Sequence, residues 1–171
     1  MTNTRILLTS IALLSFVATG FAADSTPPAT PPASTNAQPK DVSAPARKSQ
    51  SDVASKTASF GMISKTNETF KTALDAHALA EGLKQADKVG AFKGTVTKIF
   101  EPRGGNLAII NFDADYKTAM TGLLKSENFT NFPDLKLLVG KEAVVSGKLI
   151  DFQGRPEIVL TNSDQIKVVE Q

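Results

Sequence analysis

The stretch GKLIDFQGRPEIVL, residues 147–160, contains two apolar runs separated by a short turn. Gln153 and Gly154 lie between the runs, and glycine readily adopts the positive φ that a tight hairpin requires. Pro156 stands at the start of the second run, where a missing backbone N–H does little harm to a sheet. The stretch therefore predicts a β-hairpin with strands at residues 142–152 and 157–160.

Strand-like segments also precede and follow this hairpin. Residues 91–100 alternate between apolar and polar side chains, the period of a half-buried strand. The turn cluster EPRGGN, residues 101–106, separates them from a second apolar segment at residues 107–112. A third expected strand spans residues 119–124, and a last short apolar segment spans residues 166–169.

A different period separates the third expected strand from the fourth. Apolar side chains recur there every three residues, which favours a short helix interrupted by a proline: Phe129, Phe132, Leu135 and Leu138, with Pro133. The order is then strand, strand, strand, helix, strand, strand. This is the layout of an OB-fold, a five-stranded Greek-key barrel. The predicted fold class is therefore all-β with short helices, in a domain spanning residues 90–171.

Four segments of this domain resemble a known group of binding domains. Together FKGTVTKIF, LAIINFD, LVGKEAVVSGKLIDFQGRPEIVL and SDQIKVV are similar to nucleic-acid-binding OB-folds of the anticodon-binding-like group, as found in exported bacterial proteins. The resemblance covers about residues 89–169 and implies a binding module. The positions that carry it are Gly140, Lys141, Val144, Val145, Gly147, Ile150, Gly154, Arg155, Pro156, Glu157, Ile158, Leu160 and Ile166.

Three segments of different character precede this domain. Residues 1–22 contain a basic residue, an apolar run and then small residues, which is typical of a secretory signal peptide. Residues 23–59 are mostly Pro, Ala, Ser and Thr, a composition that predicts a disordered linker. Residues 60–89 contain apolar side chains at steps of three and four, which predicts an amphipathic helix in one or two segments. We therefore expect a bacterial protein of the periplasm or the medium, with no membrane span after signal cleavage.

The expected domain carries no net charge. From residue 91 onward there are ten Lys and Arg and ten Asp and Glu, and ten minus ten is zero. A neutral domain generates no long-range field to attract phosphate groups. Any binding of nucleic acid should therefore be weak and depend on local contacts.

The ligand face of an OB-fold lies over its first strands and their loops, where bases stack on aromatic rings beside basic groups. We expect Lys98, Arg103 and Lys117 to contact phosphates, with Tyr116 as a stacking surface. Phe92 and Phe100 fit either the core or this face. One groove gathering four lysines would favour a nucleic-acid ligand: Lys93, Lys98, Lys117 and Lys148.

This chain has few residues suited to catalysis or to metal binding. His77 is the only histidine and there is no cysteine, so a nucleophile lacks a base and a transition metal lacks ligands. Asn111, Asp113 and Asp115 have the spacing that opens a calcium loop, but Tyr116 occupies the position that needs glycine. We therefore expect no enzyme activity, no catalytic residues, no metal and no cofactor.

Two functions follow from these observations. The first is an exported, non-catalytic module that weakly binds single-stranded nucleic acid, such as extracellular DNA, without sequence preference. The second is an envelope or stress-response adaptor that binds a protein, a glycan or a small cationic ligand. The resemblance favours the first function, and the neutral charge of the domain favours the second.

Overall fold

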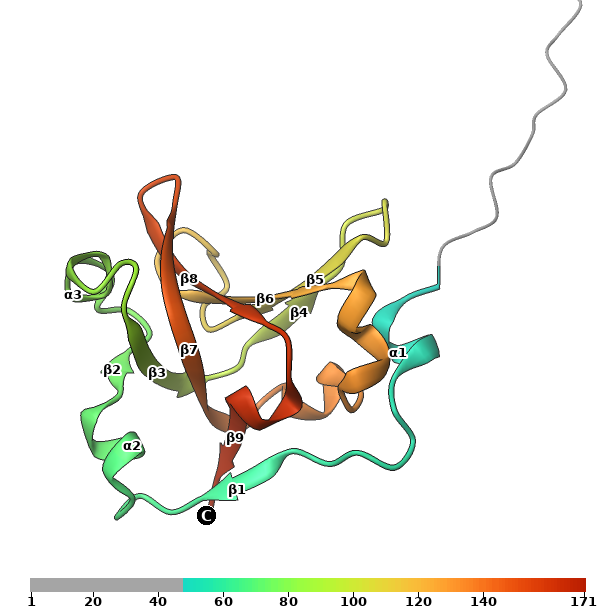
Figure 1. The fold of residues 1–171 in the computed structure, drawn as a ribbon, viewed down its shortest axis with the longest axis horizontal. Coiled ribbons are helices and arrows are strands. Elements are labelled where there is room, and N and C mark those ends of the chain that lie inside the picture. The colour runs from blue at the N-terminus through green and yellow to red at the C-terminus, as the bar shows by residue number, and fades with distance from the viewer. Residues whose placement is uncertain (1–47) are drawn as a thin grey trace, which may run out of the picture. The chain divides into compact units, whose positions relative to one another are not determined.

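The computed structural model describes residues 48–171, and every structural statement below refers to that part of the chain. It is mostly β: a mixed sheet curls into a half-barrel, and a few short helices lie along it (Figure 1). This confirms the expectation of β structure with short helices. The expected signal peptide, residues 1–22, and residues 23–47 of the expected linker lie outside the described residues.

Six strands form the curled part of the sheet, and each lies close to an expected strand. Hydrophobic alternation predicted the first as one continuous segment, whereas the structure divides it at Val96 and Thr97. The six are β3 (Val89–Thr95), β4 (Lys98–Phe100), β5 (Leu107–Asn111), β6 (Thr121–Lys125), β7 (Glu142–Phe152) and β8 (Arg155–Leu160).

Strand pairing explains why the sheet curls. The long strand β7 pairs antiparallel with β3 through its first half and with β8 through its second half. Strand β8 runs parallel to β6, and β5 joins β6 to β4 in antiparallel pairs. The order of neighbouring strands is thus β3, β7, β8, β6, β5, β4. Because only two residues separate β3 from β4 in the chain, the last strand of this order lies next in sequence to the first, and the sheet curls.

Residues 60–89 are only partly helical. They contain α2 (Glu68–Thr72) and α3 (Leu79–Lys84), together with the short strands β1 (Gly61–Ile63) and β2 (Leu74–Asp75). Strand β1 pairs parallel with β9 (Ile166–Val169), and β2 pairs parallel with β3. These two strands were not predicted, because their pairing partners lie far away in the sequence.

Gly82 in α3 has a packing role that helix propensity does not indicate. A Cβ atom at this position would lie 2.5 Å from Met120 Cε and 2.6 Å from Pro156 Cγ. Only glycine allows α3 to approach β8 this closely, although it weakens the helix by about 1 kcal/mol relative to alanine. Helix α3 thus rests directly on the hairpin strand β8.

Helix α1 (Gln50–Val53) lies inside the segment predicted as a linker, which extended to residue 59. The side chain of Gln50 is fully buried, and its Nε2 donates to the Pro133 carbonyl at 2.9 Å. Its Oε1 accepts from the Leu135 backbone N–H at 3.0 Å. The segment is therefore held by a buried polar side chain, which a composition count for apolar residues does not detect.

The core lies inside the curled sheet. Phe92 and Phe112 are buried there and meet edge to face, with ring centroids 5.2 Å apart. The helix expected between the third and fourth strands is present as two 3-10 helices, Ser126–Asn131 and Leu135–Leu138. All four apolar residues that predicted it are buried: Phe129, Phe132, Leu135 and Leu138.

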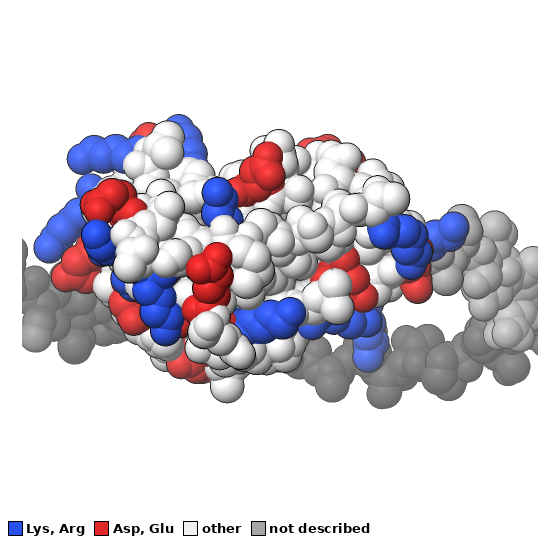
Figure 2. Space-filling view, turned by 90° about the horizontal axis from the view of Figure 1, so that it is seen from below, with Lys and Arg blue, Asp and Glu red and all other residues white. Residues whose placement is uncertain are grey.

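The surface carries both signs of charge. On the face drawn in Figure 2, Lys and Arg side chains are interspersed with Asp and Glu, and no large area of one sign is present there. This distribution agrees with the equal number of acids and bases after residue 90. Within residues 48–171, no helix is long and apolar enough to cross a bilayer.

Candidate ligand-binding groove

A groove of about 510 Å³ lies beside the turn between β7 and β8, and we call it the hairpin groove. Strands β4 to β8 all contribute to it, together with the loop between β5 and β6 and the turn between β7 and β8. Its lining residues are Lys98, Phe100, Ile109, Asn111, Ala114, Tyr116, Thr121, Phe152, Gln153, Arg155 and Glu157.

Three exposed aromatic side chains stand around the hairpin groove. Phe100, Tyr116 and Phe152 are 44%, 50% and 46% exposed, whereas Phe92 and Phe112 are enclosed in the core. Aromatic rings left partly in water at one groove offer faces on which planar ligands stack. The structure therefore assigns Phe92 to the core and Phe100 to the groove.

Cationic side chains lie against these rings. The Arg155 guanidinium carbon is 4.8 Å from the centroid of the Tyr116 ring, and Nη1 donates to the Tyr116 carbonyl at 2.9 Å. Lys98 Nζ lies 5.7 Å from the centroid of the Phe100 ring. A smaller hollow next to the groove adds Lys117, whose Nζ is 5.8 Å from the Tyr116 ring centroid. Cationic groups thus lie against two of the three exposed rings, Phe100 and Tyr116.

A row of polar side chains on four adjacent strands crosses the hairpin groove, with Lys98 at the rim and the other three at the floor. Lys98 is the direct partner of Asn111, Asn111 of Thr121, and Thr121 of Glu157. Side chains directly opposite one another in a sheet lie on the same face. Asn111, Thr121 and Glu157 are each 5% exposed or less. We call these four residues the polar row.

Glu157 is an acid in an unfavourable environment. Burial raises the pKa of its carboxyl group, while the hydrogen bond from Thr121 and the charge of Arg155 act in the opposite direction. The Thr121 hydroxyl donates to Glu157 Oε2 at 3.1 Å. A buried carboxyl group with a raised pKa at the floor of a groove makes Glu157 a candidate functional residue.

Local hydrogen bonds shape the loop that carries Tyr116. Asp113 Oδ1 accepts from the Asp115 N–H at 2.9 Å, and Asp115 Oδ1 accepts from the Lys117 N–H at 3.0 Å. His77 joins Asp113 Oδ2 at 3.1 Å to Asp75 Oδ1 at 3.0 Å, and these hydrogen bonds raise the His77 pKa. Among residues 48–171, no cluster of His, Asp or Glu is suited to hold a metal ion.

Three of the four residues predicted for the site lie at the hairpin groove or in the hollow beside it, and one does not. Lys98 and Tyr116 line the hairpin groove, and Lys117 lines the adjoining hollow. Arg103 lies in the exposed turn between β4 and β5 and is not part of the groove lining.

The four lysines named as a test do not converge on one groove. Lys93 Nζ donates to the Phe70 carbonyl at 2.8 Å, and Lys148 pairs with Asp87 at 2.9 Å. Only Lys98 and Lys117 remain near the hairpin groove. The number of phosphate contacts that it can offer is therefore small.

Sequence reasoning missed three groove residues that all come from the hairpin. Phe152 and Arg155 are direct cross-strand partners at the turn, and Glu157 follows on the same strand. In the sequence, Arg155 and Glu157 are singled out only among the positions that carry the resemblance. An aromatic immediately before a two-residue turn and an arginine immediately after it are the signal that could have found this edge.

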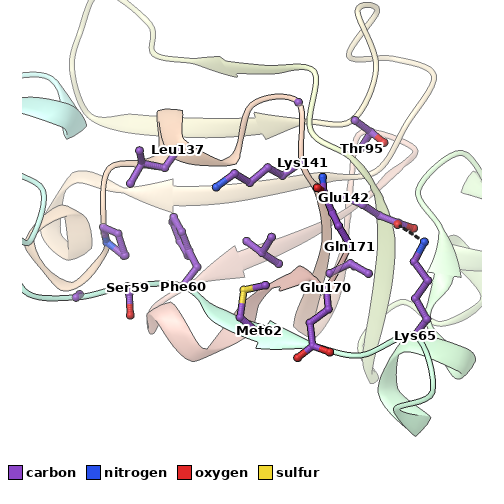
Figure 3. A pocket seen from close by; sticks show the side chains of 15 residues that line it. Ser59, Phe60, Met62, Lys65, Thr95, Leu137, Lys141, Glu142, Glu170 and Gln171 are labelled. Atoms are coloured by element: carbon purple, nitrogen blue, oxygen red, sulfur yellow. Dashed lines mark ion pairs between the residues drawn. The ribbon is translucent and has the colours of Figure 1, made fainter.

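A larger cavity of about 860 Å³ lies near β1 and β9 (Figure 3). Phe60, Met62 and Leu137 contribute apolar surface, and Lys65 pairs with Glu142 at its edge at 3.2 Å. None of the four buried polar side chains within residues 48–171 lines this cavity: Gln50, Asn111, Thr121 and Glu157. It therefore lacks the hydrogen-bonding floor that distinguishes the hairpin groove.

The hairpin groove is equipped for binding. It combines aromatic faces, cations at the rim and polar atoms at the floor, whereas no His, Cys or Ser is among its lining residues. Comparison of the chain with family models, with curated proteins and with solved structures finds no match in any of the three.

Proposed function

We propose that this protein is an exported, non-catalytic module that binds single-stranded nucleic acid weakly in the hairpin groove. The observation that carries the proposal is the gathering of three exposed aromatic rings and two cations around one groove. Each base stacked on an aromatic ring contributes about 1–3 kcal/mol, and Lys and Arg contact the phosphates. A short platform without a long basic channel is consistent with weak binding.

We further propose that the curled sheet is a five-stranded OB-fold. Strands β3 and β4 together correspond to its first strand, and β5, β6, β7 and β8 to the second to fifth. Oligonucleotide-binding OB-folds use the face of strands two and three and the loop between strands four and five. Asn111 on β5, Thr121 on β6 and the Gln153 turn all line the hairpin groove, which supports this assignment.

The proposed location is the bacterial periplasm or the medium, because residues 1–22 have the pattern of a secretory signal. Single-stranded DNA outside the cell is then the available ligand of this class. The alternative is an envelope adaptor for a protein, a glycan or a small cationic ligand. Lys98 and Arg155 at the rim disfavour a cation in this groove.

Direct titration tests the proposal. Fluorescence anisotropy of a labelled single-stranded oligonucleotide of about 15 nucleotides, long enough for one OB-fold, is measured against the full chain at low salt. We expect saturable binding that weakens by roughly tenfold or more in a Lys98→Glu, Lys117→Glu double variant, because two phosphate contacts become repulsive.

A matched double variant controls for net charge. Lys125→Glu with Lys136→Glu changes the charge by the same amount, and both residues are exposed and line neither cavity. It should bind nearly as well as the unaltered chain. Failure to bind at low salt, or equal losses in both double variants, would exclude the hairpin groove as the site and favour the adaptor function.

A further inference from the structure

The polar row has hydrogen-bonding capacity that the protein itself leaves unused. Asn111 Oδ1 is enclosed and has no hydrogen-bond partner within the described residues. The amide of Asn111 can turn to present either its oxygen or its NH₂ group. Leaving a buried polar atom unpaired is unfavourable, because the atom loses its hydrogen bonds to water and gains none. Because Oδ1 is enclosed, it meets a ligand group in the groove only after the amide turns.

Glu157 has a free acceptor as well. Thr121 donates one hydrogen bond to Oε2, which leaves that oxygen able to accept a second, and for Oε1 no partner exists among residues 48–171. Oε1 is also absent from the fully enclosed atoms without partners, so it retains contact with the groove that Glu157 lines. A carboxylate in this position accepts hydrogen bonds from ligand N–H groups and repels phosphate.

Charge divides the hairpin groove into two parts. Lys98 and Arg155 lie with the aromatic rings at the rim, and Lys117 lies in the hollow beside it. Glu157 and Asn111 form the floor. This division favours a nucleotide whose phosphate lies along the rim and whose base edge meets the floor.

We propose that the floor of the hairpin groove reads the Watson–Crick edge of a single base through Glu157, and that guanine is the preferred base. Guanine carries two adjacent N–H donors, at N1 and at the 2-amino group, that match the two oxygens of a carboxylate. Thymine and uracil offer a single ring N–H there, and cytosine and adenine a single amino group. This inference rests on the proposed function, and it departs from the sequence-independent binding expected from the sequence.

Base substitution in the ligand tests the inference without altering the protein. Oligothymidylates with one central dG, dI, dA or dC are compared with the all-thymidine strand by anisotropy on the full chain. Inosine keeps N1–H and O6 but lacks the 2-amino group. We expect the dG strand to bind at least about fivefold tighter than the others, because one good bidentate base contact discriminates to this degree, and the dI strand to lose most of that advantage.

A variant assigns the preference to Glu157. Glu157→Gln exchanges one carboxylate oxygen for a donor, so the ratio of dG to dI affinity should fall close to one. Glu127→Gln is the matched control, because Glu127 is exposed in the first 3-10 helix and lines neither cavity. Its ratio should equal that of the unaltered chain.

The outcomes separate this inference from the function on which it rests. Lack of binding to every strand contradicts the proposed function itself. Equal binding of all strands leaves the proposed function standing and overturns base reading. A dG preference that persists in Glu157→Gln overturns the role of Glu157. If that variant does not fold, as judged by its circular dichroism, the comparison of dG with dI on the unaltered chain still decides whether the 2-amino group is read.

Discussion

At the scale of single residues, the two turn positions of the hairpin have one conformation in common. Gln153 has φ 55° and Gly154 has φ 80°, so both adopt the left-handed region that a type I′ turn requires. Asp151 Oδ1 accepts from the Gly154 N–H at 2.7 Å and supports the turn. This geometry holds Phe152 and Arg155 opposite each other at the edge of the hairpin groove.

Replacement of Gly154 by valine tests the turn. No atom lies within 4 Å of the Cβ that would be added, so the change introduces backbone strain without a steric clash. Gly154→Val should lower the free energy of unfolding by about 1–3 kcal/mol, as measured by chemical denaturation. Gly104→Val, in an exposed turn where φ is not positive, should have little effect. Equal stability of the two variants would contradict the role of the turn.

The stability of Glu157→Gln should depend on pH. Burial raises the folded-state pKa of Glu157 above its unfolded value, so the protonated acid favours folding. That contribution is present below the unfolded pKa and is lost as the pH rises through the folded pKa. Glu157→Gln should therefore raise the melting temperature at pH 7, and the gain should shrink at acidic pH. A lower melting temperature at pH 7 would show that the ionised carboxylate supports the fold.

At the scale of elements, α1 is held to the sheet domain by several polar contacts, of which those of the buried Gln50 side chain lie deepest. Gln50 bonds to the segment that joins the two 3-10 helices, and Ser51 Oγ donates to Asp134 Oδ1 at 2.9 Å. The backbone N–H of Gln50 also donates to Glu101 Oε2 at 2.8 Å. A helix of four residues has almost no stability alone, so these contacts decide whether it forms.

Substitution of Gln50 should release this helix. Gln50→Ala leaves the Pro133 carbonyl and the Leu135 N–H without partners in a buried place, which is unfavourable by about 1–3 kcal/mol. Hydrogen exchange should become faster within residues 48–59 and at Leu135, while β5 and β6 stay protected. Ser51→Ala removes only a part-buried contact and should have a smaller effect. Unchanged exchange in Gln50→Ala would show that apolar contacts alone hold α1.

At the scale of the whole molecule, charge balance limits how nucleic acid can be held. The formal net charge of the chain is +2, and acids and bases are equal in number after residue 90. Long-range attraction is therefore weak, and affinity depends on the few cations of the hairpin groove and its adjoining hollow: Lys98, Lys117 and Arg155.

The salt dependence of binding should reflect the small number of cations at the groove and its adjoining hollow. Three phosphate contacts on a single strand give a slope of about −2 in a plot of log K against log salt concentration, at roughly −0.7 per contact. Arg155→Gln removes one contact and should reduce the slope by about 0.7. Anisotropy titrations over a range of salt concentrations measure both values. A much steeper slope would require a basic surface outside this groove.

Local properties of the sequence determined the hairpin and the approximate strands. The bounds of β7 agree with the predicted strand, and Gly154 has the positive φ that the turn chemistry predicted. Turn preference and hydrophobic alternation act between neighbouring residues, so a single chain reveals them. Hydrophobic alternation placed Phe92 and Phe100 on the same face of one strand. The structure interrupts that strand between β3 and β4, so Phe92 is buried and Phe100 is exposed.

The hairpin groove itself was decided only by the tertiary structure. The sequence supplied Lys98, Tyr116 and Lys117 as candidates, but the polar row exists because four strands pair in one register. Likewise Gln50 gains its function from carbonyl and amide groups more than 80 positions away in the chain. Pattern and turn chemistry report local preferences, whereas a binding site depends on which distant residues the strand pairing brings together.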